Sequence, residues 1–207
     1  MRGSGQKKGR RDVRARRPES GVVFIIGDGL TERRYFERLS RLCEMANIRP
    51  IAIEANGPEK IIKRTESMLA HYSVSPRNGD LVAIVMDLDE RYSRDEIMRM
   101  DAECAKRGYR LFISNPSFEV WLLCHFRLPT HQYDQHDILT DLERELRGPY
   151  KKSSGFDIDD QMVERAVNNA SRLLPLDNCN TGECYDRNPS TMVHSLVDSI
   201  RRMMRRR

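Results

Sequence analysis

The stretch VVFIIGDGL at residues 22–30 runs from an apolar segment into the turn Gly27-Asp28-Gly29, and TERRYFERL follows directly at residues 31–39. An apolar run that ends in glycine predicts a buried strand, and the residues behind it have the spacing of an amphipathic helix. Asp and Gly are ordinary turn residues, so one interpretation of Asp28 is that it only helps the chain to turn. A buried strand followed by a helix is the first unit of an α/β fold.

The same pattern of a strand followed by a helix repeats along the first two thirds of the chain. Strands are expected at residues 21–27, 48–55, 80–90 and 109–116, and helices at 31–46, 58–72, 93–108 and 117–126. Ser93 is expected to cap the third helix and Gly108 to end it. Strands that alternate with helices pair in parallel through right-handed crossovers. The sequence therefore predicts a doubly wound, mainly parallel four-stranded sheet within an α/β domain at residues 21–128.

The pattern changes on both sides of this domain. Beyond Pro129, three helices are expected at residues 134–148, 158–174 and 190–204, with no strand between them. These predict a helical C-terminal region over residues 129–207, appended to the sheet domain and ending in a basic tail. Residues 1–20 are rich in Gly, Arg and Lys without apolar periodicity, which predicts a disordered basic arm.

Composition and cysteine usage favour a cytoplasmic protein. The chain has 207 residues, of which 39% are hydrophobic and 32% charged, and no apolar run approaches the roughly 20 residues of a membrane helix. No apolar signal-peptide core follows the basic N-terminus. The five cysteines are scattered. Cys179 and Cys184 invite a zinc interpretation, but a structural zinc site needs about four ligands, and free thiols are the alternative.

The net charge of +5 is unevenly distributed along the chain. Residues 1–17 carry +7 and residues 201–207 carry +5, which leaves −7 for the residues between them. Basic tails attract phosphate backbones through counterion release, so nucleic acid is an expected partner. The alternative is that the tails are solvated, disordered ends without a partner.

Acidic residues follow two of the expected strands. Asp28 follows the first strand, and Asp87 and Asp89 follow the third with a spacing that directs both to the same side. In open parallel sheets, ligands bind beyond the carboxyl ends of the strands. Carboxylates that converge there repel one another unless a cation neutralises them, and hard oxygen ligands favour Mg²⁺ or Mn²⁺. The alternative is that Asp87 and Asp89 only end a strand and cap a loop.

An acidic residue with Gly after the first strand, followed by D-x-D after the third, resembles the Toprim domain of topoisomerases, primases and nucleases. The chain is most similar to the RloB (AbiL-type) family of prokaryotic defence proteins. The stretches that carry this resemblance are GDGLTERRYF, VMDLDE, SNPSFEVWLLCHF, YKK, NNA and NPSTMVHSLV. The family usually has Glu-Gly where this chain has Asp28-Gly29, and the shorter side chain implies a water-mediated metal contact or weaker activity. Glu32 matches an acidic position of the family, but interaction with the helix dipole is an equally good account.

Several further residues follow strands or lie in loops that the resemblance includes. Glu119 is charged within an apolar helix, which favours a metal ligand or a group that supports one. Asn115 before Pro116 is expected to cap the fourth helix, and Asn188 before Pro189 the last one. Lys151 and Lys152 match the family's tyrosine-lysine element and would hold a phosphate or stabilise its charge, or else be solvated loop lysines. Trp121 is expected in the core, and His125, His131 and His136 are expected to be structural or exposed.

The expected function is metal-dependent phosphodiester hydrolysis of nucleic acid, with Asp28, Asp87 and Asp89 as the metal ligands. The resemblance implies a toxic effector in antiphage defence, beside a partner ATPase of the AAA/ABC type. The main rival is a catalytically impaired subunit that binds nucleic acid or the ATPase. A small-molecule phosphatase of the haloacid-dehalogenase type is disfavoured, because its D-x-D follows the first strand. The sequence leaves homo-oligomerisation, and the choice between DNA and RNA, open.

Overall fold

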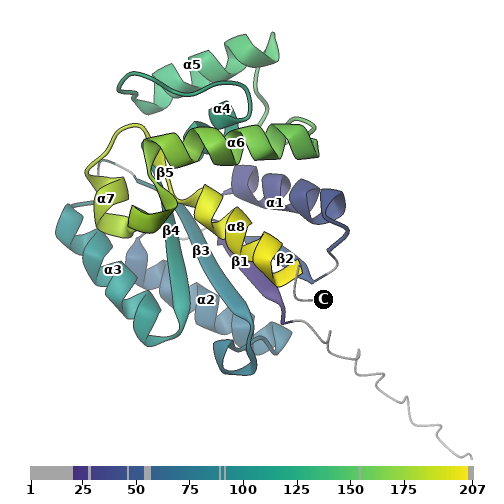
Figure 1. Cartoon of the computed structure of the whole chain (residues 1–207). Helices are drawn as coiled ribbons and strands as arrows, with labels where there is room; N and C mark the ends of the chain where they lie inside the picture. The colour runs from purple at the N-terminus through teal and green to yellow at the C-terminus, as the bar shows by residue number, and fades with distance from the viewer. Residues whose placement is uncertain are drawn as a thin grey trace, which may run out of the picture.

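The computed structural model (Figure 1) describes most of the chain beyond the basic arm. The described residues are 21–27, 29–45, 47–53, 57–88, 90, 92–153 and 155–204. The predicted disordered arm, the end of the basic tail, Asp28 and Asp89 lie outside them.

Five strands form one sheet in the order β2-β1-β3-β4-β5. The strands are β1 (Val23–Gly27), β2 (Ile48–Ala52), β3 (Leu81–Asp87), β4 (Tyr109–Asn115) and β5 (Ser190–Thr191). The first four are parallel, and Val23 of β1 lies opposite Ile48 on one side and Leu81 on the other. The predicted mainly parallel α/β sheet is confirmed, and the first and third strands are neighbours in it.

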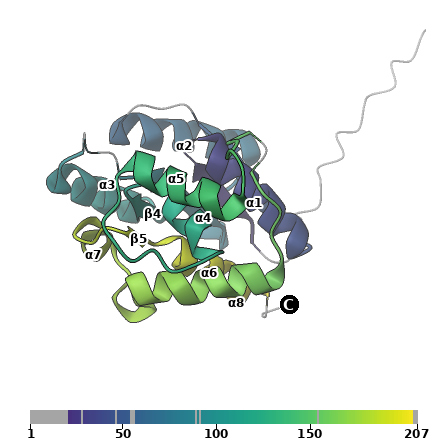
Figure 2. The same ribbon diagram turned by 90° about the horizontal axis from the view of Figure 1, so that it is seen from above.

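Helices cover both faces of this sheet and the edge at which the parallel strands end. They are α1 (Leu30–Leu42), α2 (Pro58–Tyr72), α3 (Arg94–Lys106), α4 (Glu119–Cys124), α5 (Gln135–Leu146), α6 (Asp160–Leu173), α7 (Thr181–Tyr185) and α8 (Val193–Met204), with 3₁₀ turns at Pro76–Asn78 and Leu176–Asn178. Helices α2 and α3 lie on one face and α8 on the other, while α4, α5 and α6 lie beyond the carboxyl ends of the strands (Figures 1 and 2). Among the described residues, no helix is long and apolar enough to cross a membrane.

The predicted limits of the third helix are confirmed by its hydrogen bonds. The Ser93 side chain accepts from the Glu96 amide and the Glu96 carboxylate accepts from the Ser93 amide, which forms a capping box. Gly108 follows the helix with a φ of 74°, a conformation that glycine adopts without a steric penalty.

A fifth strand corrects the prediction of four. Ser190 and Thr191 form β5, antiparallel to β4, and α8 begins only at Val193 rather than at residue 190. The Ser114 and Thr191 hydroxyl oxygens are 2.8 Å apart, which links the two strands on their buried side. A strand of two residues is too short to show the alternation by which strands are recognised in a sequence, and its pairing depends on the far end of β4.

Neither of the two Asn-Pro pairs caps a helix, contrary to the prediction. Helix α4 begins at Glu119 with Phe118 at its N-cap, and the Asn115 amide instead donates to the Tyr185 carbonyl at 2.9 Å. Asn188 forms two hydrogen bonds with the backbone of Tyr133. Both Asn-Pro bonds are cis. The asparagines therefore hold distant loops together rather than starting helices.

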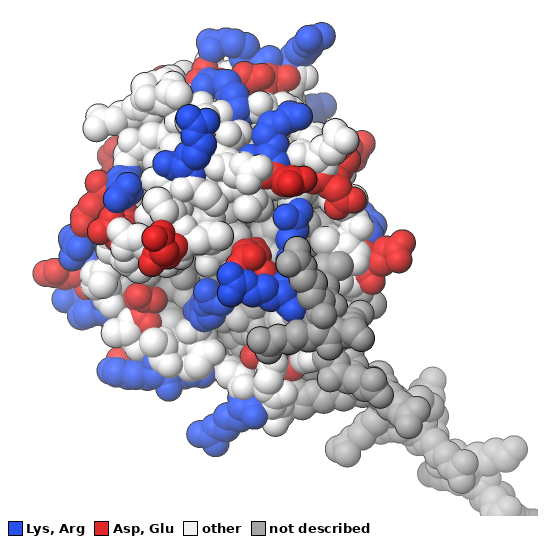
Figure 3. Space-filling view, viewed as in Figure 1, with Lys and Arg blue, Asp and Glu red and all other residues white. Residues whose placement is uncertain are grey.

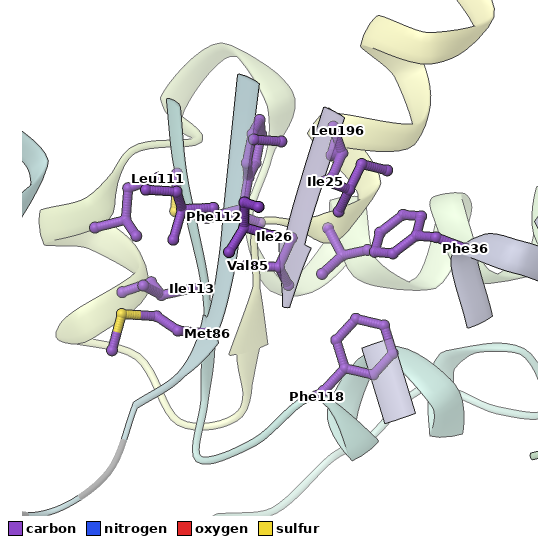
Figure 4. Packing of buried hydrophobic residues seen from close by; sticks show 14 of the residues in the cluster. Ile25, Ile26, Phe36, Val85, Met86, Leu111, Phe112, Ile113, Phe118 and Leu196 are labelled. Atoms are coloured by element: carbon purple, nitrogen blue, oxygen red, sulfur yellow. The ribbon is translucent and has the colours of Figure 1, made fainter. Parts of the chain in front are cut away.

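One hydrophobic core joins the sheet to helices from both ends of the chain. Ile25 and Ile26 of β1 and Val85 of β3 lie at its centre, and Figure 4 shows Phe36 of α1 beside Phe118, with Leu196 of α8 nearby. All six are essentially inaccessible to solvent, and so is Trp121, as predicted. The core therefore includes residues of the predicted C-terminal region as well as those of the predicted α/β domain.

Candidate functional site

The candidate site lies where β1 and β3 end side by side. From these neighbouring strands the chain leaves in opposite directions, since β1 leads through α1 to β2 and β3 leads through α3 to β4. Such a switch point leaves a crevice at the carboxyl end of the sheet, where ligands of doubly wound proteins bind. Asp87 is the last residue of β3, and Gly27, the last residue of β1, lies opposite Val85. The register therefore places Asp87 at the edge of this crevice.

Asp87 is held in place by the segment that precedes α4. Its Oδ1 atom accepts a hydrogen bond of 2.7 Å from the Phe118 amide. Its pKa is raised well above the ordinary range of an aspartate, chiefly by burial and then by the negative charges of Glu32 and Glu119. The hydrogen bond from Phe118 and the charge of Lys152 act in the opposite direction. Asp87, Glu32 and Glu119 thus form one electrostatically coupled group, the acidic cluster.

Glu32 belongs to this cluster, although the sequence alone did not place it among the expected ligands. It lies in the first turn of α1 with only 3% of its surface exposed. A Cβ atom on Gly27 would lie 2.7 Å from the Cβ of Glu32, and one on Gly29 would lie 3.1 Å from its Oε2. The glycines therefore make room for the Glu32 side chain as it folds back over the end of β1. In the sequence, the signal for Glu32 was its match to an acidic position of the RloB family. A favourable interaction with the helix dipole explained an acidic residue at this position equally well.

Glu119 and Lys152 bring two more predicted residues to the same place. Glu119 opens α4 and is 5% exposed, and Lys152 comes from the loop between α5 and α6. The Lys152 Nζ atom lies 3.7 Å from Glu119 Oε1, with most of the lysine side chain exposed. Tyr150 of the same loop has a pKa raised to about 12 by burial and by the charges of Glu119 and Glu32, against a side-chain hydrogen bond with Thr31. Lys152 thus pairs with the cluster, and Lys151 lies directly before it at an exposed position.

The described residues do not by themselves form a complete metal site. Asp28 and Asp89, two of the three expected ligands, lie outside them. Within the part of the chain that the structure describes, no group of three His, Cys, Asp or Glu residues could hold a metal ion. The same finding gives no support to a zinc site at Cys179 and Cys184, which are both free thiols. The magnesium site therefore stays a prediction.

The histidines lie where the sequence analysis expected them. His125 is fully buried, and burial lowers its pKa to about 4. Its ring nitrogens lie 3.2 Å from the Tyr35 hydroxyl and 3.0 Å from the Trp121 carbonyl, so the ring joins α1 to α4. His131 and His136 are exposed.

The surface around the site carries charges of both signs. On the face shown in Figure 3, Lys and Arg side chains lie among Asp and Glu side chains rather than in one continuous basic field. On α1, Arg33 and Arg34 both pair with Glu37. This mixture fits the calculated charge of −7 for the residues between the tails, and it leaves the tails as the most basic parts of the chain.

A parallel sheet with acidic side chains gathered at the β1/β3 switch point defines a doubly wound α/β protein with a candidate acidic site. The family model described as RloB-like protein matches residues 23–200, which is most of the chain. The chain therefore belongs to the RloB-like protein family. Neither the search of curated proteins nor the search of solved structures found a match.

Proposed function

We propose that this protein is a metal-dependent nuclease that hydrolyses phosphodiester bonds of nucleic acid at the acidic cluster. The observation that carries the proposal is the gathering of Asp87, Glu32 and Glu119 from β3 and two different helices at the carboxyl end of the sheet, which also raises the pKa of Asp87. The negative charges of such carboxylates repel one another, and a bound cation would offset this repulsion. Their position at the switch point of a doubly wound sheet is the position at which such proteins bind ligands.

The donor set fits a hard divalent cation. The cluster offers carboxylate oxygens, which Mg²⁺ and Mn²⁺ prefer. Asp87 would hold the ion together with Asp28, which follows β1 in the sequence, and Asp89, which follows β3, while Glu32 and Glu119 would add negative charge beside Asp87. When bound, the ion would supply an activated water and positive charge for the phosphate.

The other residues of the site have roles that follow from their positions. The Phe118 amide fixes the Asp87 carboxylate, so the ligand does not need to reorganise when a cation binds. Lys152 lies at the exposed edge of the cluster, where its ammonium group would bind a phosphate oxygen of the substrate. Lys151, its exposed neighbour, would add positive charge for the same nucleic-acid substrate.

A second candidate function is a binding subunit with an impaired site. The observation that favours it is Asp28, because the family usually has a glutamate in this place and aspartate is one methylene shorter. In that case the acidic cluster would be a catalytic site that has lost its activity, and the basic tails would hold nucleic acid or a partner protein.

The test compares variants in two assays, one of cleavage and one of metal binding. Asp87→Asn is expected to abolish Mg²⁺- or Mn²⁺-dependent cleavage of plasmid, single-stranded DNA and tRNA, and to weaken Mn²⁺ binding measured by calorimetry. The exposed Asp177→Asn is the matched control and should change neither. Full cleavage by both Asp87→Asn and Asp89→Asn would refute a nuclease that works at the acidic cluster.

The Asp28→Glu variant separates the two candidate functions. If the aspartate only weakens an active nuclease, the glutamate should keep or raise the rate of cleavage. If the wild-type protein and Asp28→Glu both bind nucleic acid but cleave none of the three substrates with either metal, the binding subunit is favoured.

We further propose that the protein is a toxic effector of antiphage defence, controlled by an ATPase of the AAA/ABC type. Membership of the RloB-like family supports this proposal. A nuclease without control would damage its host, so the isolated chain is expected to cleave slowly. Co-expression with an ATPase encoded beside it should make the wild-type chain toxic on infection, whereas Asp87→Asn should not be toxic.

A further inference from the structure

A cavity of about 510 Å³ opens beside the acidic cluster, at the carboxyl ends of β3 and β4. Leu88, which follows Asp87 directly, forms part of its wall, and so does Pro116, two residues before the Phe118 amide that holds Asp87. The rest of the described wall comes from the segment after β3, the end of β4, the loop before α5 with the first turn of that helix, and the end of α7 with the loop behind it. Helix α7 lies beside β4 (Figure 1). Adjacent strands are about 4.8 Å apart, so the ends of β3 and β4 bring this cavity close to Asp87.

Hydrogen bonds hold the walls of the cavity in place. The Tyr185 hydroxyl donates to the Tyr92 carbonyl at 3.2 Å, and the Tyr185 carbonyl accepts from the Asn115 amide at 2.9 Å. Asn188 donates to and accepts from the backbone of Tyr133 at 2.7 and 2.9 Å. These contacts join four segments that are distant in the sequence, so the cavity is formed before any ligand binds.

The chemistry of the described lining disfavours a phosphate group and suits a planar ring. Among the residues that the structure describes, no lysine or arginine lines the cavity, and Glu90 and Asp134 give it negative charge. The start of α5 does not offer a site for an anion, because the Asp134 carboxylate already accepts from the His136 and Asp137 amides. Tyr92, Tyr185 and Pro116 instead provide flat apolar surfaces on which a base can stack.

Polar groups at the mouth of the cavity remain available for a ligand. Within the described chain, neither the Gln135 amide nor the His136 ring makes a side-chain hydrogen bond, and both residues line the cavity and are exposed. The Glu90 carboxylate and the Asn115 carbonyl oxygen add acceptors. Acceptors of this kind pair with the exocyclic amines of adenine and cytosine, which thymine lacks.

We propose that this cavity binds one unstacked nucleobase of the substrate strand, next to the phosphate at the acidic cluster, and prefers a base with an exocyclic amine. The proposal rests on the proposed nuclease function, since it makes the cavity the part of that site that selects the base. A single-stranded or locally opened substrate follows from it, because a paired base cannot enter the cavity.

The test measures the binding of fluorescein-labelled dA₁₂, dC₁₂ and dT₁₂ by fluorescence anisotropy in EDTA, where no cleavage occurs. The wild-type protein is expected to bind dA₁₂ or dC₁₂ several-fold more tightly than dT₁₂. Gln135→Ala and His136→Ala should each reduce this preference about 2- to 10-fold, the effect of one lost hydrogen bond. Gln132→Ala, at an exposed glutamine in the loop before α5 that does not line the cavity, is the matched control.

The outcomes separate this proposal from the proposed nuclease. Equal binding of the three oligonucleotides, or an unchanged preference in both variants, would overturn the base pocket and leave the nuclease untouched. If Gln135→Ala and His136→Ala lose binding to the partner ATPase but bind the three oligonucleotides as the wild-type protein does, the cavity binds a protein partner. That result would also overturn the proposal. Asp87→Asn should keep the preference for dA₁₂ or dC₁₂, because it alters the acidic cluster and not the cavity.

Discussion

At the scale of single residues, the carboxylate of Asp87 is held in an environment that disfavours its charge. Burial contributes most, and the negative charges of Glu32 and Glu119 add to it. A group whose pKa is higher in the folded than in the unfolded chain binds its proton more tightly when folded. The free energy of unfolding therefore falls as the pH rises from about 4 through the pKa of the folded state.

The first prediction follows from the raised pKa of Asp87. Without metal at pH 7.5, Asp87→Asn should raise the melting temperature, because it removes a carboxylate whose charged form the folded state disfavours. The asparagine oxygen can still accept the hydrogen bond from the Phe118 amide. At pH 4 the gain should largely vanish. Calorimetry in EDTA at both pH values, with the exposed Asp177→Asn as control, checks this. A lower melting temperature for Asp87→Asn at pH 7.5 would contradict it.

Gly27 is the second residue whose identity follows from the packing of the site. Gly27 lies at the buried end of β1, and a Cβ atom added there would lie 2.7 Å from the Glu32 Cβ, well inside contact distance. Gly27→Ala is expected to lower the free energy of unfolding by about 1–3 kcal/mol, as overpacking does elsewhere. Gly148→Ala is the matched control, since a Cβ there meets no atom within 4 Å. Urea unfolding measures both, and equal effects of the two substitutions would refute the explanation.

At the scale of elements, β5 and α8 attach the C-terminal region to the sheet. β5 extends the sheet beyond β4, and Leu196, Val197 and Ile200 of α8 are fully buried in the main core. The loop between α5 and α6 connects the same region to the acidic cluster through Lys152. The C-terminal elements therefore help to position the candidate site.

The third prediction tests whether these elements unfold together with the sheet. Leu196→Ala should destabilise the whole chain by about 2–5 kcal/mol, the range for a leucine removed from a core. Trp121, the single tryptophan, lies in α4, so its fluorescence and the far-UV circular dichroism should shift to lower urea by the same amount. Leu176→Ala, at a leucine that is 42% exposed, is the control. A Trp121 transition that does not move would show that α8 unfolds separately.

At the scale of the whole molecule, charge is divided between an acidic body and basic ends. The fourth prediction is that removal of residues 1–17 weakens nucleic-acid binding and flattens its dependence on salt, because fewer counterions are released. The slope of log K against log[salt] for dC₁₂ should decrease by at least about 0.7, the contribution of one phosphate contact on a single strand. A full-length chain whose arm has Gln in place of Lys and Arg should behave like the deletion. An unchanged slope would show that the arm does not contact phosphates.

The α/β class, the parallel pairing of the first four strands and the placement of Asp87 at a strand end could all be predicted from the sequence. These features depend on local periodicity and on the rule that crossovers are right-handed, both of which are present in short stretches of sequence. The helix limits at Ser93 and Gly108 were predictable for the same reason, since capping involves neighbouring residues.

Which side chains meet could be seen only in the folded protein. Glu32 joins Asp87 because α1 packs its first turn over Gly27, and Lys152 reaches Glu119 across more than thirty residues of chain. Asn115 and Asn188 resembled helix caps in the sequence, but their partners, Tyr185 and Tyr133, lie 70 and 55 residues away. The two-residue strand β5 has no local signal either, and forms because β4 offers it a free edge. Contacts of this kind are set by how the elements pack, and no periodicity within one stretch of sequence encodes them.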